Sequence, residues 1–430
     1  MKKVLIITYY WPPSGGSGVQ RWLKFAKYLP ENKWKPYIYT PENPYLEVID
    51  KDLEKDIHKD TDVWRLPIWE PYRIKDQLFS KKKDTQSSGV IQKDGSLINK
   101  FFLWFRGNFF IPDPKKYWIN PSVKFLLKKL QDESINTIIT TGPPHSMHLI
   151  GYELKKKIDI KWIADFRDPW SNLDMLNEFY LSKRSMKKHV NLEKKVLKLA
   201  DICLTVSESW AQSFKNLGSR RVELITNGFD RDDFSYNEVK REKFIVGHYG
   251  LINHLRNPII LWRVLDDLCS ENEIFNNLLE IHFAGNVDKS ILNMISAFPT
   301  LQQKVKNLGY ITHKEVISCY QKSSILLLLL FNSKSGVGNY PGKLFEYFAA
   351  NRPILAFGPA ESDTKNMIIA TKSGIYHDYD ANYQDLKENV LQLFNQRNMS
   401  YQNNELSMFG RRELTKRLVK LLNGLNGDCS

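Results

Sequence analysis

The sequence predicts an α/β protein with two domains, each built from a parallel sheet wound with helices. Its 430 residues exceed the size at which a single hydrophobic core stops growing, so two domains are expected. Hydrophobic residues make up 42% and charged residues 26%, which are ordinary globular values and exclude a disordered or fibrous chain. Short runs rich in Val and Ile alternate with segments of helical period along the whole chain, and this alternation is typical of βαβ units.

Residues 1–235 are expected to form the first Rossmann-like domain. Six short apolar runs predict its strands: KVLIIT, PYIYT, INTIITTG, KWIADF, ICLTVS and VELITNG. Between the first two runs, the segment VQRWLKFAKYL places its apolar residues at the i, i+3, i+4, i+7 spacing of one helix face. Residues 80–98 are rich in Ser, Lys, Asp and Gly, and we expect them to form a loop excursion.

Residues 236–408 are expected to form the second Rossmann-like domain, after a polar linker within 227–243. Its strands are predicted from the runs FIVGHYG, LEIHFAG, KNLGYI, SILLLLLF and PILAF. The most apolar run, residues 324–331, falls far short of the roughly 20 residues that cross a bilayer, so we interpret it as a buried strand. Residues 409–430 are amphipathic and are expected to form a helix that packs back on the first domain.

Charge and cysteine content narrow the function classes. The formal net charge of +14 indicates attraction to an anionic partner. The charge alone does not decide whether that partner is nucleic acid, an acidic lipid surface or a phosphorylated substrate. The four cysteines are far apart with no CxxC pair, which argues against a zinc knuckle or a disulfide framework and favours a reducing cytosol.

A glycine-rich loop, PPSGGSGVQR, joins the first predicted strand to the first helix. Gly15, Gly16 and Gly18 permit close backbone approach, and a helix N-terminus offers N–H groups to an anion, so the loop could hold a phosphate or a sugar. The loop is not a dinucleotide fingerprint, because Arg21 stands where the third glycine belongs. A tight turn with no ligand is the alternative.

Two further predicted strand ends of the first domain carry polar residues. In TTGPPHSMHLIG, His145 lies at the start of a helix and is expected to face a ligand crevice, whereas His148 is expected to pack. In ADFRDPW, Asp165, Arg167 and Asp168 form either a ligand site or an Arg–carboxylate cluster that fixes the turn.

The second domain offers three charged candidates. Arg256, in GHYGLINHLRNP, has the planar donor fork that suits phosphate. In PGKLFEYFAANRPILAF, Lys343 and Glu346 share one helix face directly after the most buried strand. The helix dipole and Lys343 favour phosphate, while Glu346 can accept hydrogen bonds from the vicinal hydroxyls of a ribose. The alternative is a helix-surface ion pair, worth a few tenths of a kcal/mol.

These motifs together resemble the GT-B glycosyltransferases, specifically the family 4-like group that makes bacterial surface polysaccharides. The run PGKLFEYFAANRPILAF looks like the donor-binding signature of that group, and GGSG, TGPPHS, ADFRDPW and ITNGFD occur in the same order as in those enzymes. The resemblance implies two Rossmann-like domains that face a central cleft. It also implies that Glu346 holds the ribose, that His145 contacts the transferred sugar or its phosphate, and that the loop of Gly15, Gly16 and Gly18 approaches the diphosphate.

The sequence departs from the family at two positions. Gly338 stands eight residues before Glu346, where the family often has the first acid of an EX7E pair, and Leu251 interrupts the usual Arg and Lys pair. We therefore assign neutralisation of the leaving phosphate to Arg256 and Lys343, which together with His145 form the expected catalytic set. The expected donor is a UDP- or GDP-linked sugar that acts as co-substrate, with no separate cofactor and no metal, and the family suggests a retaining outcome.

Two segments of the first domain point to a membrane surface. Residues 100–118 interleave aromatic residues with cations, and residues 183–198 form a strongly basic helix. We expect both to touch an anionic inner leaflet, so that a cytoplasmic enzyme works at the periphery of the membrane on a glycan or lipid-linked acceptor. The alternatives are a core-facing aromatic stripe and a solvated helix face.

Two other functions are weighed against transfer. A non-hydrolysing sugar-nucleotide epimerase would act on the donor without an acceptor. A non-catalytic GT-B-fold binding protein could use the basic surface for nucleic acid, but no recognised nucleic-acid motif supports that reading, and no nucleic-acid partner is expected.

Overall fold

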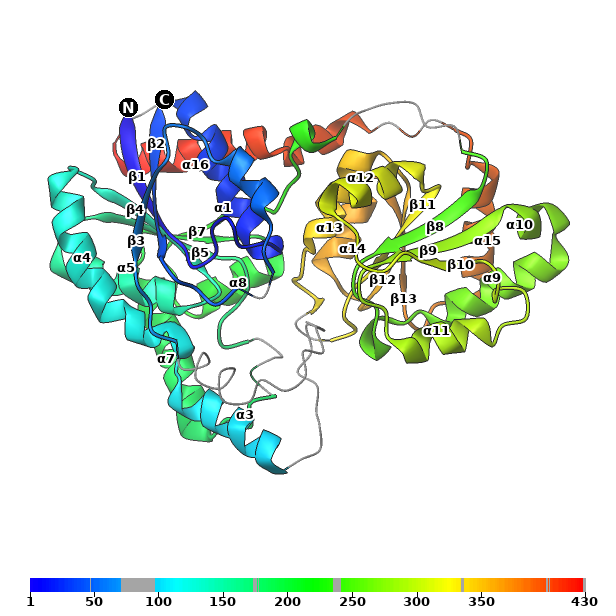
Figure 1. Cartoon of the computed structure of the whole chain (residues 1–430), viewed down its shortest axis with the longest axis horizontal. Helices are drawn as coiled ribbons and strands as arrows, with labels where there is room; N and C mark the ends of the chain where they lie inside the picture. Colours follow the sequence, from blue (N-terminus) through cyan, green and yellow to red (C-terminus); the bar gives the residue numbers. More distant parts are fainter. Residues whose placement is uncertain are drawn as a thin grey trace. The chain divides into compact units, whose positions relative to one another are not determined.

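A computed structural model describes the chain as two compact units. The described residues are 1–46, 48–70, 97–172, 176, 178–234, 241–333, 336–399, 401 and 403–427. The first unit comprises Met1–Thr226 with Arg411–Ser430, and the second comprises Asn227–Gly410. In each unit a parallel sheet lies between layers of helices (Figure 1).

The first unit contains a seven-stranded parallel sheet in the order β3-β2-β1-β4-β5-β6-β7. The strands are β1 (Lys2–Ile7), β2 (Trp34–Pro41), β3 (Asp62–Leu66), β4 (Thr137–Gly142), β5 (Lys161–Phe166), β6 (Ile202–Thr205) and β7 (Val222–Leu224). The helices are α1 (Ser17–Tyr28), α3 (Leu97–Phe109), α4 (Ile119–Asp132), α5 (Ser146–Lys157), α7 (Lys183–Leu199), α8 (Glu208–Asn216) and α16 (Arg411–Leu425). Because β1 pairs with both β2 and β4, the strand order reverses beside β1, where open α/β sheets bind ligands.

The core of the first unit lies on both faces of this sheet. Along β1, Leu5 and Ile7 join one apolar cluster while Val4 and Ile6 join the other, as the two-residue period of a strand requires. Helices α4, α5 and α7 cover the first face. Helices α1 and α16 cover the second, so the C-terminal helix belongs to the first unit.

The second unit contains a six-stranded parallel sheet in the order β10-β9-β8-β11-β12-β13. The strands are β8 (Phe244–Tyr249), β9 (Leu279–Ala284), β10 (Val305–Asn307), β11 (Ile325–Leu329), β12 (Ile354–Gly358) and β13 (Gly374–Asp378). The helices are α9 (Ile259–Glu271), α10 (Glu273–Leu278), α11 (Lys289–Ser296), α12 (His313–Lys322), α13 (Gly342–Ala350), α14 (Asp363–Ala370) and α15 (Tyr383–Asn395). The strand order reverses between β8 and β11, which brings the ends of these strands and the start of α13 together.

Two strands of the structure, β3 and β13, were not predicted from the sequence, and β10 was predicted a few residues too late. Both missed strands lie at sheet edges and carry half-buried or exposed side chains, so neither reads as a continuous apolar run. The loop excursion expected over 80–98 falls outside the described residues up to residue 96, and its last two residues belong to α3.

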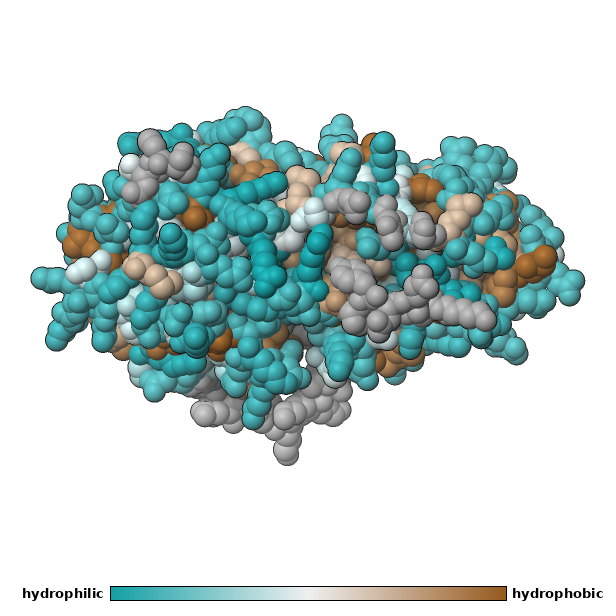
Figure 2. Space-filling view, turned by 90° about the horizontal axis from the view of Figure 1, so that it is seen from above, coloured by the Kyte–Doolittle hydropathy of each residue, from teal (hydrophilic) through white to brown (hydrophobic). Residues whose placement is uncertain are grey.

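The surface is largely hydrophilic on the face that Figure 2 shows, where apolar residues form small separate patches. Three cysteines among the described residues, Cys203, Cys269 and Cys319, are free thiols. None of the helices that the structure describes combines the length and the apolar character needed to cross a membrane.

Candidate functional site

The second unit places Lys343 against the end of β8. Lys343 is the second residue of α13, and its ammonium lies so close to Gly250 that a Cβ on residue 250 would come within 1.9 Å of Nζ. Gly285, which follows β9, has φ +107°, and a Cβ there would meet the Gly250 carbonyl oxygen at 2.8 Å. Glycine at these two positions therefore lets two strand ends and one ammonium group approach closely.

Arg256 and His248 each have a side-chain nitrogen in this region that lacks a hydrogen-bond partner. The Arg256 guanidinium lies 3.5 Å from the ring centroid of Phe331, and its Nε is buried without a hydrogen-bond partner. His248 Nδ1 bonds the Leu327 carbonyl oxygen at 2.8 Å, whereas its Nε2 is buried and has no partner. These orphaned nitrogens are groups that a bound ligand can satisfy.

Burial weakens the charged forms of all three groups. It lowers the pKa of Lys343 to about 8, with the Arg256 charge adding to the effect, and it lowers the pKa of Arg256 to about 10. It also lowers the pKa of His248 to about 3, so this imidazole is neutral at pH 7. No carboxylate in the described ranges forms an ion pair with Arg256 or Lys343. Within the described residues the two cations thus have no ion-pair partner, an arrangement that favours an anionic ligand.

Glu346 lies one turn beyond Lys343 and is held by α12. Its carboxylate accepts hydrogen bonds from Tyr320 Oη at 2.6 Å and from His313 Nε2 at 3.2 Å. Burial opposes ionisation, but the bonds from His313 and Tyr320 and the Lys343 charge together leave the pKa of Glu346 below its usual value. The side chain stays 27% exposed. No ion pair joins Lys343 to Glu346, so the helix-surface ion pair considered as the alternative is not formed.

The glycine-rich loop of the first unit mainly packs against its own chain. A Cβ on Gly15 would meet Val48 Cγ1 at 2.9 Å, and one on Gly18 would meet Tyr10 Cδ2 at 3.1 Å. Gly16, with φ +88°, precedes α1 and has nothing within 4 Å of its Cβ position. Of the three glycines, Gly16 is the position with open space for a ligand.

His145 is buried at the start of α5 rather than exposed. Its side chain stacks on Trp170, with ring centroids 5.0 Å apart and planes 1° from parallel. Both ring nitrogens lack a protein partner, and burial holds the pKa of His145 well below its usual value. His148 packs on Phe166 and bonds Thr140 Oγ1 at 2.9 Å, as its expected packing role requires.

The ADFRDPW motif forms structural links between loops. Asp165 is fully buried and accepts bonds from Arg21 Nη2 at 3.0 Å and Trp22 Nε1 at 2.7 Å, which fixes α1 to β5. Arg167 donates to the carbonyl oxygens of Gly18 at 2.8 Å and Pro143 at 2.7 Å. The turn-fixing alternative describes these contacts, although Asp165 pairs with Arg21 and not with its neighbour Arg167.

Two side chains of helix α7 hold Trp170 in place. His189 Nδ1 accepts a bond from Trp170 Nε1 at 3.0 Å, and the Glu193 carboxylate accepts one from the Trp170 backbone N–H at 3.0 Å. Because Trp170 stacks on His145, the buried side of α7 sets the position of that imidazole.

Sequence reasoning missed His248, Gly285, His313 and Tyr320. The two glycines in GHYG and the small residues in HFAG after predicted strands were the available signal for the first two. His313 and Tyr320 reach Glu346 from another helix, and nothing in the local sequence indicates that contact.

Comparison with known proteins defines the fold as GT-B. No protein-family model matches the sequence, and neither does any curated protein. Sucrose-phosphate synthase from Thermosynechococcus elongatus is similar with a TM-score of 0.63 at 12% identity, over 100% of both chains. HepE from Anabaena, in complex with UDP-glucose, gives 0.60 at 12% identity over 99% of this chain and 100% of its own. A Listeria monocytogenes protein assigned as a UDP-N-acetylglucosamine 2-epimerase gives 0.57 at 10% identity over 100% and 98%. At these identities the likeness establishes the fold alone.

Proposed function

We propose that the chain is a family 4-like glycosyltransferase that moves a sugar from a nucleoside-diphosphate sugar to a glycan or lipid-linked acceptor of a bacterial surface polysaccharide. The observation that carries this proposal is a pair of neighbouring cations: Lys343 at the start of α13, and Arg256, whose charge acts on Lys343. Neither has a carboxylate ion-pair partner among the described residues, and Glu346 lies one turn beyond Lys343. Two cations without an ion-pair partner suit a diphosphate, and a partly exposed carboxylate suits the two hydroxyls of a ribose.

The chemistry assigned to this site is displacement at the anomeric carbon. The bond from the anomeric carbon to the diphosphate oxygen breaks, the bond to the acceptor oxygen forms, and the nucleoside diphosphate leaves with the electron pair and takes up the acceptor proton. Arg256 and Lys343 stabilise the negative charge that develops on the leaving diphosphate. These two cations can supply the charge compensation, and we keep metal independence and a retaining outcome as parts of the proposal.

His145 and Gly16 are assigned to the transferred sugar and its phosphate. The imidazole is neutral and has two unused ring nitrogens, so it can donate one hydrogen bond and accept another without a change of charge. Gly16 leaves space beside the N-terminus of α1, where backbone N–H groups favour an anion. These assignments follow the family resemblance of the two motifs.

The fold is shared with a protein assigned as an epimerase, so epimerisation of the donor is the second candidate. The two functions differ in their need for an acceptor. An epimerase turns over the nucleotide sugar by itself, whereas a transferase releases nucleoside diphosphate only when an acceptor hydroxyl is present.

A panel of UDP-, GDP- and CMP-sugars in a thermal-shift assay tests the proposal. One nucleoside-diphosphate sugar is expected to raise the melting temperature, because a ligand that binds only the folded state stabilises it. Glu346→Ala should remove that shift, and Glu388→Ala, on the exposed surface of α15, should keep it. A panel with no shift, or an equal shift in Glu346→Ala, would contradict the site. Donor turnover without acceptor would favour the epimerase.

A further inference from the structure

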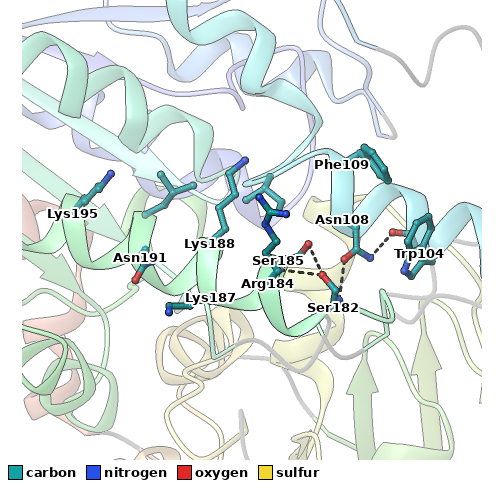
Figure 3. A pocket seen from close by; sticks show the side chains of 12 residues that line it. Trp104, Asn108, Phe109, Ser182, Arg184, Ser185, Lys187, Lys188, Asn191 and Lys195 are labelled. Carbon is teal, nitrogen blue, oxygen red and sulfur yellow. Dashed lines mark hydrogen bonds between the residues drawn. The ribbon is translucent and has the colours of Figure 1, made fainter.

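A groove with a volume of about 720 Å³ lies between α3 and α7 of the first unit (Figure 3). Arg184, Lys187, Lys188 and Lys195 of α7 line one side, and Trp104, Asn108 and Phe109 of α3 line the other. A smaller hollow of about 280 Å³ shares Leu192 and Lys195 with the groove and extends it toward α4 and α5. The two hollows together could seat an extended ligand along α7.

The α7 side of the groove carries positive charge without compensation. The helix has seven Lys and Arg residues and a single acid, Glu193. Glu193 is 1% exposed and bonds Trp170 and Ser171, so its charge faces inward. Among the residues with described positions, no carboxylate pairs with any of the four lining cations. The outer face of α7 therefore presents cations alone, which favours an anionic partner.

The α3 side presents apolar rings to solvent. All five aromatic residues of this helix are exposed, with exposed fractions from 39% to 58%: Phe101, Phe102, Trp104, Phe105 and Phe109. The rings pack on one another, with centroids 4.7 Å apart for Phe105 and Phe109 and 5.9 Å apart for Phe101 and Trp104. A contiguous exposed ridge of this kind marks a contact surface, since single scattered rings would need no explanation.

The groove is held in shape by specific contacts. A Cβ on Gly107 would meet Phe179 Cβ at 2.5 Å, so glycine lets α3 lie directly on the segment before α7. Asn108 donates to the Trp104 carbonyl oxygen at 2.8 Å and accepts from the Ser182 backbone N–H at 2.9 Å. Ser182 in turn caps α7 through the backbone N–H of Ser185. The spacing between the ridge and the cations is thus fixed before any ligand binds.

We propose that this groove binds the phosphate head groups of an anionic phospholipid bilayer, with the aromatic ridge of α3 lying in the interfacial layer. Aromatic side chains concentrate at the head-group level, and clustered Lys and Arg residues attract anionic lipid. Nucleic acid fits less well, because base stacking needs ring faces that are free, and here the faces are turned toward other rings. The proposal concerns where the first unit docks and does not depend on the transfer reaction.

Co-sedimentation of the full chain with two kinds of vesicle tests the proposal: phosphatidylcholine alone, and an equal mixture with phosphatidylglycerol. The chain should sediment with the mixed vesicles and much less with the neutral ones. Joint replacement Lys188→Ala and Lys195→Ala should lower partitioning about 25-fold, since each cation contributes a factor of about five. Trp104→Ser with Phe109→Ser should lower the binding that persists in high salt, where charge attraction is screened.

The matched control removes two cations from the other face of the same unit. Arg417→Ala with Lys420→Ala, on α16, should leave partitioning within about twofold, because these side chains would lie beyond the Debye screening length of about 10 Å from the docked surface. Equal binding to neutral and mixed vesicles would overturn the proposal, as would an equal loss in the α16 control. Binding to single-stranded RNA that anionic vesicles cannot displace would assign the groove to nucleic acid instead.

Discussion

The ammonium group of Lys343 rests on the backbone of Gly250, and a Cβ added at residue 250 would lie 1.9 Å from Nζ and 2.5 Å from Cε. Lys343 can keep this place only while residue 250 has no side chain. Gly250 directly follows β8, and Lys343 is the second residue of α13, so one steric relationship fixes a cation of the candidate site to the centre of the second sheet.

Gly250→Ala is expected to weaken binding of a nucleoside diphosphate about tenfold or more, because the displaced ammonium loses a charge-assisted contact with the phosphate. Stability should change by less than about 1 kcal/mol, since the clash is with the far end of a flexible side chain. Isothermal titration with UDP and GDP and urea unfolding measure the two effects. Gly424→Ala, in α16 with nothing within 4 Å, is the control and should leave affinity unchanged. Equal affinity of both variants would contradict the role of Lys343.

Deprotonation of Lys343 should change stability and affinity for a diphosphate in opposite directions as the pH rises. In the folded chain its pKa is about 8, and in the unfolded chain it is near 10.5. Between these values the unfolded state binds the extra proton, so the contribution of Lys343 to stability rises with pH. Affinity for a diphosphate should fall over the same interval, because the uncharged amine attracts phosphate less. Titrations and unfolding curves on either side of pH 8 measure both.

Lys343→Gln serves as the control for this pH dependence. The variant should bind UDP or GDP weakly at every pH and should lose both slopes above pH 8, while groups elsewhere titrate as before. Parallel affinity profiles for the wild type and Lys343→Gln would show that the proton responsible lies on another group.

Glu346 is expected to discriminate ribose from deoxyribose. The wild type should bind a ribonucleoside diphosphate about 10- to 100-fold more tightly than its 2′-deoxy analogue, the range for a hydrogen bond to a charged group. Glu346→Ala should lose this ratio. His313→Ala should lose part of it, because the carboxylate keeps the Tyr320 bond and loses the one from His313. Calorimetry with the two nucleotides measures the ratio. A ratio that survives in Glu346→Ala would place the ribose elsewhere.

Strands buried on both faces were predictable from the sequence, and edge strands were not. SILLLLLF became β11 because a parallel strand covered on both sides reads as a continuous apolar run. β13, with the sequence GIYHD, is half-buried along its whole length and offers no such run. The hydrophobic pattern reports burial, so it fails where burial is partial.

Candidate residues were predictable where the determinant was local. Lys343 and Glu346 lie one helical turn apart, and three-residue spacing is visible in a sequence. The partners that define their environment, Gly250 and His313, come from other elements that the fold brings together. Arg21 is the clearest case, because its carboxylate partner Asp165 lies 144 positions away.

His145 is expected to act without changing its charge. His145→Ala should bind the donor with wild-type affinity and lose transfer, since the ring is assigned to the reacting sugar. Because burial keeps its pKa well below neutrality, the wild-type rate should show no histidine step between pH 6 and 8. Initial rates over that range measure this. Trp170→Phe keeps a stacking ring and should retain most activity, whereas full activity in His145→Ala would remove the residue from the mechanism.

Asp165 and Arg21 are expected to support the first unit and not the chemistry. Both side chains are almost fully buried, and Asp165 also accepts hydrogen bonds from Trp22 and Thr141. Asp165→Ala therefore leaves a buried guanidinium and two further donors without their acceptor. A loss of about 3–5 kcal/mol in the free energy of unfolding is expected for breaking such a pair. Asp52→Ala breaks an ion pair that is at least 80% exposed on both sides and should cost under about 1 kcal/mol. Urea unfolding measures both variants, and equal losses would mean that the buried pair contributes no more than a surface one.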